Sequence, residues 1–392
     1  MGDAAEWVAE HLDDLYCGEL DQSGTFPGGQ TAADRALATF DVAGYAARRN
    51  EVLPLQRRGA SGLSPYIRHG LLPLPRVWAE VAGGPDRDVA KFRDELLWQE
   101  YARHMYARLG SRNAEPLRSR RLVESSGDPW DTDMACVTTT LRELETDGWL
   151  VNQTRMWLAS HWSVRHGAPW RAGEDRFFRH LVDGSRAANR LGWQWTAGFG
   201  TGRPYGFSRH QVERRAPGLC ATCPYDAECP IADWPDNPPL EPVDRDPRLT
   251  ADSDLAATAG PSAPGQLSDP EAVWVTAESL GDDDPALAAH PELPAVFVFD
   301  EPLLRRLQLS AKRLVFLTES LADLAERRPV EVQRGAPSEV LAGCAVATTF
   351  TPVPGWRRIA ADVRPVAVHP WPWLRQPHAG SLASFSAWRK AL

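Results

Sequence analysis

Apolar residues recur at helical spacing through most of the first 235 positions. Helical spacing also runs from Val89 to Leu109. There the polar Glu95 and the aromatic Trp98 and Tyr101 fall at three-residue steps and so share one face of a helix. We expect further helices at 4–16, 32–49, 133–163 and 174–197, with two helices in each of the last two ranges. Because the alternation typical of strands is almost absent, the pattern predicts a helical domain at 1–235.

Residues 236–270 interrupt this pattern with a proline-rich composition in which Asp, Ser, Gly and Ala fill the intervals. The prolines are Pro238, Pro239, Pro242, Pro247, Pro261, Pro264 and Pro270. We expect a linker that is partly extended and mobile.

The pattern changes again at 271–392, where short apolar runs alternate with helical segments such as Ala311–Arg328. The runs are Ala272–Thr276, Ala295–Phe299, Val330–Val332 and Ala345–Thr349. Strands alternating with helices predict a smaller α/β domain with a parallel, Rossmann-like sheet. This region has no GxGxxG, so the pattern identifies no dinucleotide site in it.

Charge narrows the choice of partners. The 392-residue chain has a net charge of -9, which argues against nucleic-acid binding over its whole surface. Residues 151–215, however, carry 11 basic residues against four acids. Such a segment favours a local nucleic-acid site, and a solvated face with accidental clustering is the alternative. No apolar run approaches the ~20 residues of a membrane span, so we expect a cytoplasmic protein without structural disulfides.

Three cysteines form the strongest local motif. Cys220 and Cys223 are separated by two residues, and Cys229 follows and precedes a proline. This spacing is typical of zinc or iron–sulfur ligands, for which a fourth ligand is needed. The candidates for that ligand are Cys17, Cys136, Cys344 or a histidine.

The stretch from Trp149 to Trp195 is dense in both aromatic and polar side chains. It holds six tryptophans together with Arg155, Asp183 and Asn189. These are too many large aromatics for an ordinary amphipathic face and too many polar groups for a plain core. We infer that the stretch handles a buried aromatic cofactor and a nucleic-acid base. Upstream, the small and hydroxylic run at 59–66 precedes a helix and suits a phosphate, with an ordinary N-cap loop as the alternative.

Five motifs, in order, resemble the photolyase and cryptochrome flavoproteins over roughly Gly28 to Gly198. They are Ala60-Ser61-Gly62-Leu63-Ser64-Pro65-Tyr66; Glu95-Leu96-Leu97-Trp98; Gly148-Trp149 with Asn152 and Arg155-Met156; Asp183-Gly184 with Ala187-Ala188-Asn189; and Gly192-Trp193-Gln194-Trp195. Three positions depart from the family pattern, namely Ala60, Gln99 and Ser185, where relatives carry Thr, Arg and Asp. The resemblance implies a mainly α-helical FAD-binding domain.

The resemblance also implies residue roles. The FAD would be held by Tyr45, Ser61, Leu63, Ser64, Trp149, Arg155, Asp183, Ser185 and Asn189. The catalytic set facing a flipped lesion would be Glu95, Trp98, Asn152, Met156 and Trp195. Electrons would pass inward through Trp170 and Trp193.

The cysteines resemble those of a bacterial branch of this family that carries a [4Fe–4S] cluster. In particular, the segment at 133–137 is similar to the segment of that branch that holds the first ligand. The resemblance implies that the ligands are Cys136, Cys220, Cys223 and Cys229.

The order of the domains is unusual for this family, in which an α/β antenna domain comes first. Because 271–392 resembles that antenna domain, we interpret the chain as a circular permutation; an unrelated α/β domain joined by fusion is the alternative. The R-x-D-L-R motif expected after the first strand is absent, which leaves the antenna chromophore unassigned.

Together these features predict a light-dependent repair enzyme. The resemblance implies a deoxyribodipyrimidine photolyase, a carbon–carbon lyase that uses photoexcited reduced FAD to split cyclobutane dimers in damaged DNA. We expect a monomer. One alternative is a cryptochrome-like blue-light photoreceptor with the same flavin pocket. Another is a light-independent Fe–S module that binds nucleic acid.

Overall fold

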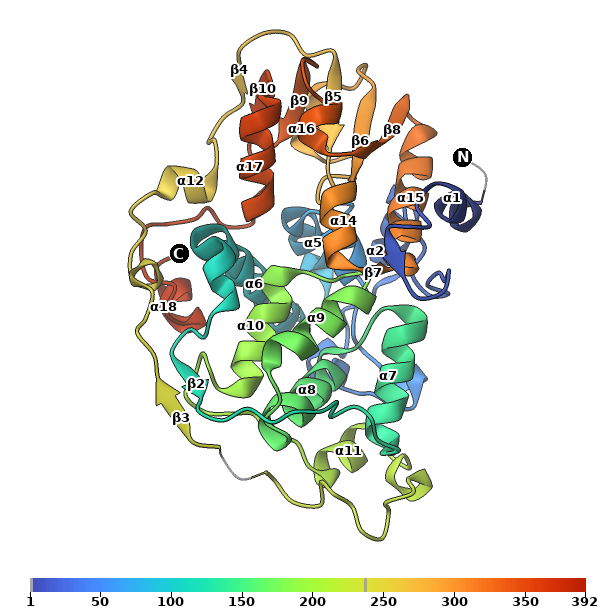
Figure 1. Cartoon of the computed structure of the whole chain (residues 1–392), viewed down its shortest axis with the longest axis vertical. Coiled ribbons are helices and arrows are strands. Elements are labelled where there is room, and N and C mark those ends of the chain that lie inside the picture. Colours follow the sequence, from blue (N-terminus) through green and yellow to red (C-terminus); the bar gives the residue numbers. More distant parts are fainter. Residues whose placement is uncertain (1–2, 236–237) are drawn as a thin grey trace.

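The computed structural model describes residues 3–235 and 238–392. Most helices of residues 3–235 form one end of the molecule and an α/β region forms the other, but the first helix lies at the α/β end (Figure 1). The helices of the first region are α1 (Ala4–His11), α2 (Gln30–Thr39), α3 (Tyr45–Arg48), α4 (Ser64–Arg68), α5 (Leu74–Glu80), α6 (Asp86–Leu109), α7 (Ala135–Asp147), α8 (Asn152–Ser160), α9 (Trp170–His180), α10 (Arg186–Ala197) and α11 (Arg209–Arg215). The expectation of a mainly helical domain followed by an α/β region is confirmed.

Two of the expected helices are shorter than the periodicity suggested. The first ends at His11, and Tyr16–Cys17 forms strand β1, which pairs in parallel with β7 (Leu309–Ser310). The helix expected at 32–49 is divided into α2 and α3: the backbone becomes extended at Phe40, and α3 begins only after Gly44, which adopts a left-handed conformation at φ 79°. That conformation favours glycine and interrupts a helix.

The α/β region contains a six-stranded sheet in the order β4-β10-β9-β5-β6-β8. Its strands are β4 (Gly265–Gln266), β5 (Ala272–Val275), β6 (Ala295–Asp300), β8 (Val330–Gly335), β9 (Val346–Thr349) and β10 (Ala367–His369). The pairings are parallel except for β4, which runs antiparallel along the edge. The helices that accompany the sheet are α13 (Pro285–Ala289), α14 (Glu301–Leu307), α15 (Ala311–Ala325), α16 (Pro337–Val340) and α17 (Pro354–Val363). The last helix, α18 (Phe385–Lys390), packs against α6 instead. Burial on both faces explains the continuous apolar runs of β5, β6 and β9.

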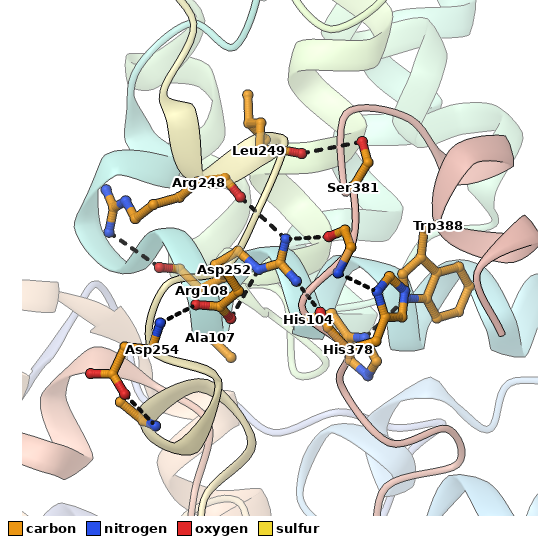
Figure 2. A network of polar contacts seen from close by, with 12 residues as sticks. His104, Ala107, Arg108, Arg248, Leu249, Asp252, Asp254, His378, Ser381 and Trp388 are labelled. Carbon is orange, nitrogen blue, oxygen red and sulfur yellow. Dashed lines mark hydrogen bonds and ion pairs between the residues drawn. The ribbon is translucent and has the colours of Figure 1, made fainter.

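The proline-rich segment is extended, as expected, but it is bound along the molecule. Its strand β3 (Leu240–Pro242) pairs with β2 (Ser119–Arg121), and it also contains the short helix α12 (Leu255–Ala259). Figure 2 shows how Arg108, near the end of α6, holds the segment in place. Its guanidinium lies 3.1 Å from Asp252 Oδ2 and donates to the Arg248 carbonyl at 3.2 Å. These bonds oppose the mobility that the composition suggested.

The two regions share one hydrophobic core. Buried residues of α4, such as Tyr66, belong to the same cluster as Val273 and Phe297 of the sheet and Phe316 of α15. Tyr66 and Phe316 have ring centroids 6.0 Å apart. The secondary structure therefore changes between 1–235 and 271–392, but side chains of the two regions pack in one hydrophobic cluster.

Candidate flavin and nucleic-acid site

The centre of the candidate site is an ion pair between Arg155 of α8 and Asp183, in the loop between α9 and α10. Arg155 Nη2 lies 2.7 Å from Asp183 Oδ2, and the Asp183 side chain is only 4% exposed. Arg155 Nε also donates to the Leu150 carbonyl at 2.9 Å, which fixes the orientation of the guanidinium. The expected pairing of these two residues is confirmed.

Two buried polar atoms of the 183–189 segment lack a hydrogen-bond partner among the described residues. They are the acceptor Asp183 Oδ1 and the donor Asn189 Nδ2. Buried polar groups in proteins are nearly always bonded, and these two atoms, like others in the described residues, are free to bond a ligand. A planar ring that carries an N–H group next to carbonyl oxygens, as the flavin ring does, can satisfy both atoms. The residues present therefore fit FAD.

Ser185, the residue that departs most from the family pattern in this segment, caps α10. Its hydroxyl accepts a hydrogen bond from the Ala188 amide at 3.4 Å. This is the ordinary role of serine at a helix N-terminus. Its contact with FAD stays a prediction.

Motifs far apart in the sequence meet at Trp149. Its indole Nε1 donates to Ser64 Oγ at 2.9 Å, which joins the start of α4 to the segment before α8. On the α4 side, Ser61 Oγ accepts from the amide of the fully buried Leu63 at 3.3 Å. Tyr45, expected beside these residues, is also buried. The structure thus brings the phosphate motif and the Trp149 motif together.

Asn152 and Met156 lie side by side on the first turns of α8. Asn152 Nδ2 is 3.5 Å from Met156 Sδ, so the two side chains point the same way, as expected. Trp195 is 38% exposed and contacts Tyr205 at a centroid distance of 5.4 Å. The Tyr205 hydroxyl accepts in turn from Gln153 of α8 at 3.2 Å. Tyr205 was not among the expected site residues, because it stands in a segment without periodicity.

Glu95 and Trp98 are both engaged by other side chains. Glu95 forms ion pairs with Lys91 at 2.8 Å and Arg49 at 3.4 Å. The Trp98 indole stacks on Phe385 of the C-terminal helix α18, with centroids 3.9 Å apart and planes inclined by 11°. One face of the Trp98 indole is therefore covered by Phe385. Among the described ring pairs, none joins Trp98 to Trp195.

Trp193 lies in a cluster of buried aromatics that differs from the expected chain. Its ring is 5.1 Å from Phe177 and 6.2 Å from Trp130, centroid to centroid. Among the described ring pairs, Trp170 contacts only Phe199, at 6.5 Å. Trp130 is therefore the neighbouring tryptophan of Trp193 in the structure. No local pattern indicates this contact, because the two residues lie some sixty positions apart.

One small cavity is lined by the four cysteines expected as ligands, Cys136, Cys220, Cys223 and Cys229. Cys136 starts α7, and the other three lie in the loop after α11. Burial and the neighbouring thiols raise the pKa of Cys136 to about 12. In the part of the chain that the structure describes, no group of three or more His, Cys, Asp or Glu side chains is placed to hold a metal ion. The four cysteines line one cavity, and their role as ligands stays a prediction.

Comparison with known proteins gives a match in the region of this site. Residues 92–211 match the family model described as the FAD-binding domain of DNA photolyase. The chain is 32% identical over 203 residues to the deoxyribodipyrimidine photo-lyase of Synechococcus sp., covering 46% of this chain and 41% of that protein. It is 34% identical over 182 residues to the enzyme of Thermus thermophilus, covering 42% and 41%. The chain thus spans only 41% of the length of these relatives.

Solved structures show related matches. A bacterial class III photolyase from Agrobacterium tumefaciens is 26% identical with a TM-score of 0.37, covering 43% of this chain and 38% of the other. A cryptochrome from Synechocystis sp. is 22% identical with a TM-score of 0.44, covering 51% and 46%.

The site and the sequence match define the class of this part of the molecule, an FAD-binding domain. Within the helical region, residues 92–211 are similar to the FAD-binding domain of DNA photolyases. Across the described residues, no helix is both long enough and apolar enough to cross a membrane.

Proposed function

We propose that this chain is a light-dependent DNA photolyase that binds FAD and splits cyclobutane pyrimidine dimers. The observation that carries the proposal is the buried Arg155–Asp183 pair, with Asp183 Oδ1 and Asn189 Nδ2 left unpaired inside the region matched to the family. When bound, reduced FAD supplies the electron that splits the dimer, and the protein supplies position and shielding.

The residues on the DNA side have the chemistry that a flipped base requires. Trp195 offers an exposed aromatic face, and base–aromatic stacking contributes ~1–3 kcal/mol per base. Asn152 is exposed on the same side of α8 as Met156, so its amide can bond a base edge. The surrounding basic segment at 151–215 favours the phosphate backbone.

The shared thiol cavity supports a second cofactor, and we include a [4Fe–4S] cluster in the proposal. A zinc ion needs all its ligands at about 2.0–2.3 Å from one point, whereas each thiolate of a cluster binds a different iron. Four cysteines that line one cavity would offer one thiolate to each iron of such a cluster. A monomer located in the cytoplasm, and a circular permutation of the family's domain order, complete the proposal.

One observation favours a different function for the same flavin pocket. Phe385 covers Trp98, and Lys91 and Arg49 engage Glu95, so two of the five expected lesion contacts are occupied. A blue-light photoreceptor needs a flavin but no base-binding set. This is the second candidate function.

The test illuminates reduced, FAD-loaded protein with an oligonucleotide that contains a cyclobutane dimer, with a dark sample as control. We expect light-dependent loss of the lesion. Asp183→Ala should abolish FAD binding, whereas Asp175→Ala, which removes a 52% exposed carboxylate nearby, should leave it intact. Bound FAD without repair would refute the photolyase and leave the photoreceptor. Protein that binds no FAD would refute both.

A further inference from the structure

The loop that carries Asp183 is held from outside the helical region. Its backbone turns between α9 and α10, and Gly184 N donates to the Leu181 carbonyl at 3.1 Å within it. Several of the loop's carbonyl oxygens accept hydrogen bonds from side chains that belong to, or contact, the α/β region. The position of the Asp183 carboxylate therefore depends on more than α9 and α10.

Arg313, near the start of α15, makes the deepest of these contacts. It is only 3% exposed. Its Nε donates to the Leu181 carbonyl at 2.9 Å, and its Nη2 donates to the Phe178 carbonyl. The guanidinium also lies 4.4 Å from the centre of the Phe178 ring. Among the described residues no carboxylate lies within ion-pair distance of Arg313, so carbonyls and an aromatic face hold this buried cation.

Gly184 shows how closely Arg313 approaches the loop. A Cβ atom at Gly184 would lie 1.8 Å from Arg313 Nη2, so any larger residue there would displace the guanidinium. The glycine next to Asp183 is thus required by a side chain of the α/β region.

Arg68 and His69 join the same loop to the turn that follows β5. Arg68 Nε donates to the Gly184 carbonyl at 2.8 Å, and its Nη1 lies 2.8 Å from Glu278 of that turn. The His69 ring has one nitrogen 3.0 Å from the Val182 carbonyl and the other 2.7 Å from a carbonyl in the turn. The carbonyls of residues 181, 182 and 184 are therefore all engaged.

We propose that Arg313 is a positioning residue for the flavin: it fixes the 181–185 loop from the α/β region and so presents the Asp183 carboxylate to the cofactor. The inference rests on the proposed function, because it takes Asp183 as a flavin contact. The α/β region is then part of the flavin site, whether or not it holds a chromophore of its own.

The test compares three variants. Arg313→Met removes the guanidinium, Gly184→Ala disturbs the same contact from the loop side, and Arg313→Lys keeps the positive charge. The matched control is Arg328→Met. Arg328 also caps carbonyls, those of residues 287, 290 and 293, but all of these lie within the α/β region. Two readouts are taken for the full chain: hydrogen–deuterium exchange of the 181–185 amides in the protein without FAD, and the Kd for FAD by fluorescence titration.

Arg313→Met and Gly184→Ala should both speed exchange in the loop and raise the Kd for FAD by about tenfold or more. Arg313→Lys should restore part of the affinity, and Arg328→Met should change neither readout. Should Arg313→Met fail to fold, Gly184→Ala carries the test. Unchanged exchange in the loop, or faster exchange with unaltered FAD affinity, would overturn the positioning role. Wild-type protein that binds no FAD would instead overturn the proposed function itself.

Discussion

Arg108 provides the sharpest test of how the proline-rich segment is attached. Its side chain is 1% exposed and Asp252 is 5% exposed, so the ion pair between them is buried. The guanidinium also donates to the Gly380 carbonyl at 2.7 Å and to the carbonyls of Arg248 and His378. It thereby joins α6, the linker and the C-terminal segment (Figure 2).

Arg108→Met keeps most of the side-chain volume but removes every one of these bonds. The change leaves a buried carboxylate and three carbonyls without their donor. Breaking a buried ion pair from one side costs ~3–5 kcal/mol, so we expect a loss of that size in the free energy of unfolding. Because the Met side chain fills the space, little of the loss should come from a cavity.

Unfolding in urea is measured by tryptophan fluorescence. Trp388 lies within the same network of polar contacts and so reports on it. The matched control is Arg248→Met. The Arg248 side chain is 38% exposed and pairs with Asp246, and exposed ion pairs contribute about 0–1 kcal/mol to stability. Limited proteolysis at 244–254 should become faster only in Arg108→Met. A loss below about 1 kcal/mol, equal to that of the control, would refute the anchored linker.

Three further predictions concern single residues. His104 is buried and accepts from Trp388 Nε1 at 3.0 Å; burial, together with nearby positive groups, lowers its pKa to about 3. Because its folded pKa lies below that of the unfolded chain, His104 contributes a loss of stability of ~1.4 kcal/mol per pH unit as pH falls below about 6.5. Burial also lowers the pKa of His69, His161 and His180, so His104→Gln should reduce the total slope at pH 5–7 by its own share in unfolding experiments. Cys220→Ser should remove any iron–sulfur absorbance while Cys344→Ser keeps it; persistence in Cys220→Ser would contradict the ligand set. Trp195→Ala should weaken binding of dimer-containing DNA by ~1–3 kcal/mol in a fluorescence anisotropy titration, and equal affinity would exclude stacking.

Much of the fold could be predicted from local pattern. The periodicity of α6 and the buried runs of β5 and β6 are signals within a few neighbouring positions. The short strand β10 was missed because three residues are too few to show a pattern. The break between α2 and α3 starts at Phe40 and depends on backbone conformations that only the folded chain reveals.

The candidate site shows the same division. Asn152 and Met156 sit four positions apart on one helix, so their shared direction follows from helix geometry. The stacking of Trp98 on Phe385 joins positions nearly three hundred residues apart, and no local rule predicts it. Sequence reasoning therefore recovered residues that share an element, and the family motifs recovered the contact of Arg155 with Asp183. Contacts between the two ends of the chain, such as that of Trp98 with Phe385, were missed.

Two buried arginines show why such long-range contacts cannot be predicted from the sequence, although the proposed site depends on them. Arg108 and Arg313 bond mainly to backbone carbonyls, which every residue possesses, so their partners leave no trace in side-chain composition. Each arginine nevertheless joins segments more than a hundred residues apart. A buried cation is costly unless such partners are in place, so the two regions must dock in one arrangement for either arginine to be satisfied. Under the role proposed for Arg313, the Asp183 loop takes its shape only when the α/β region is docked, so the proposed flavin site depends on both regions.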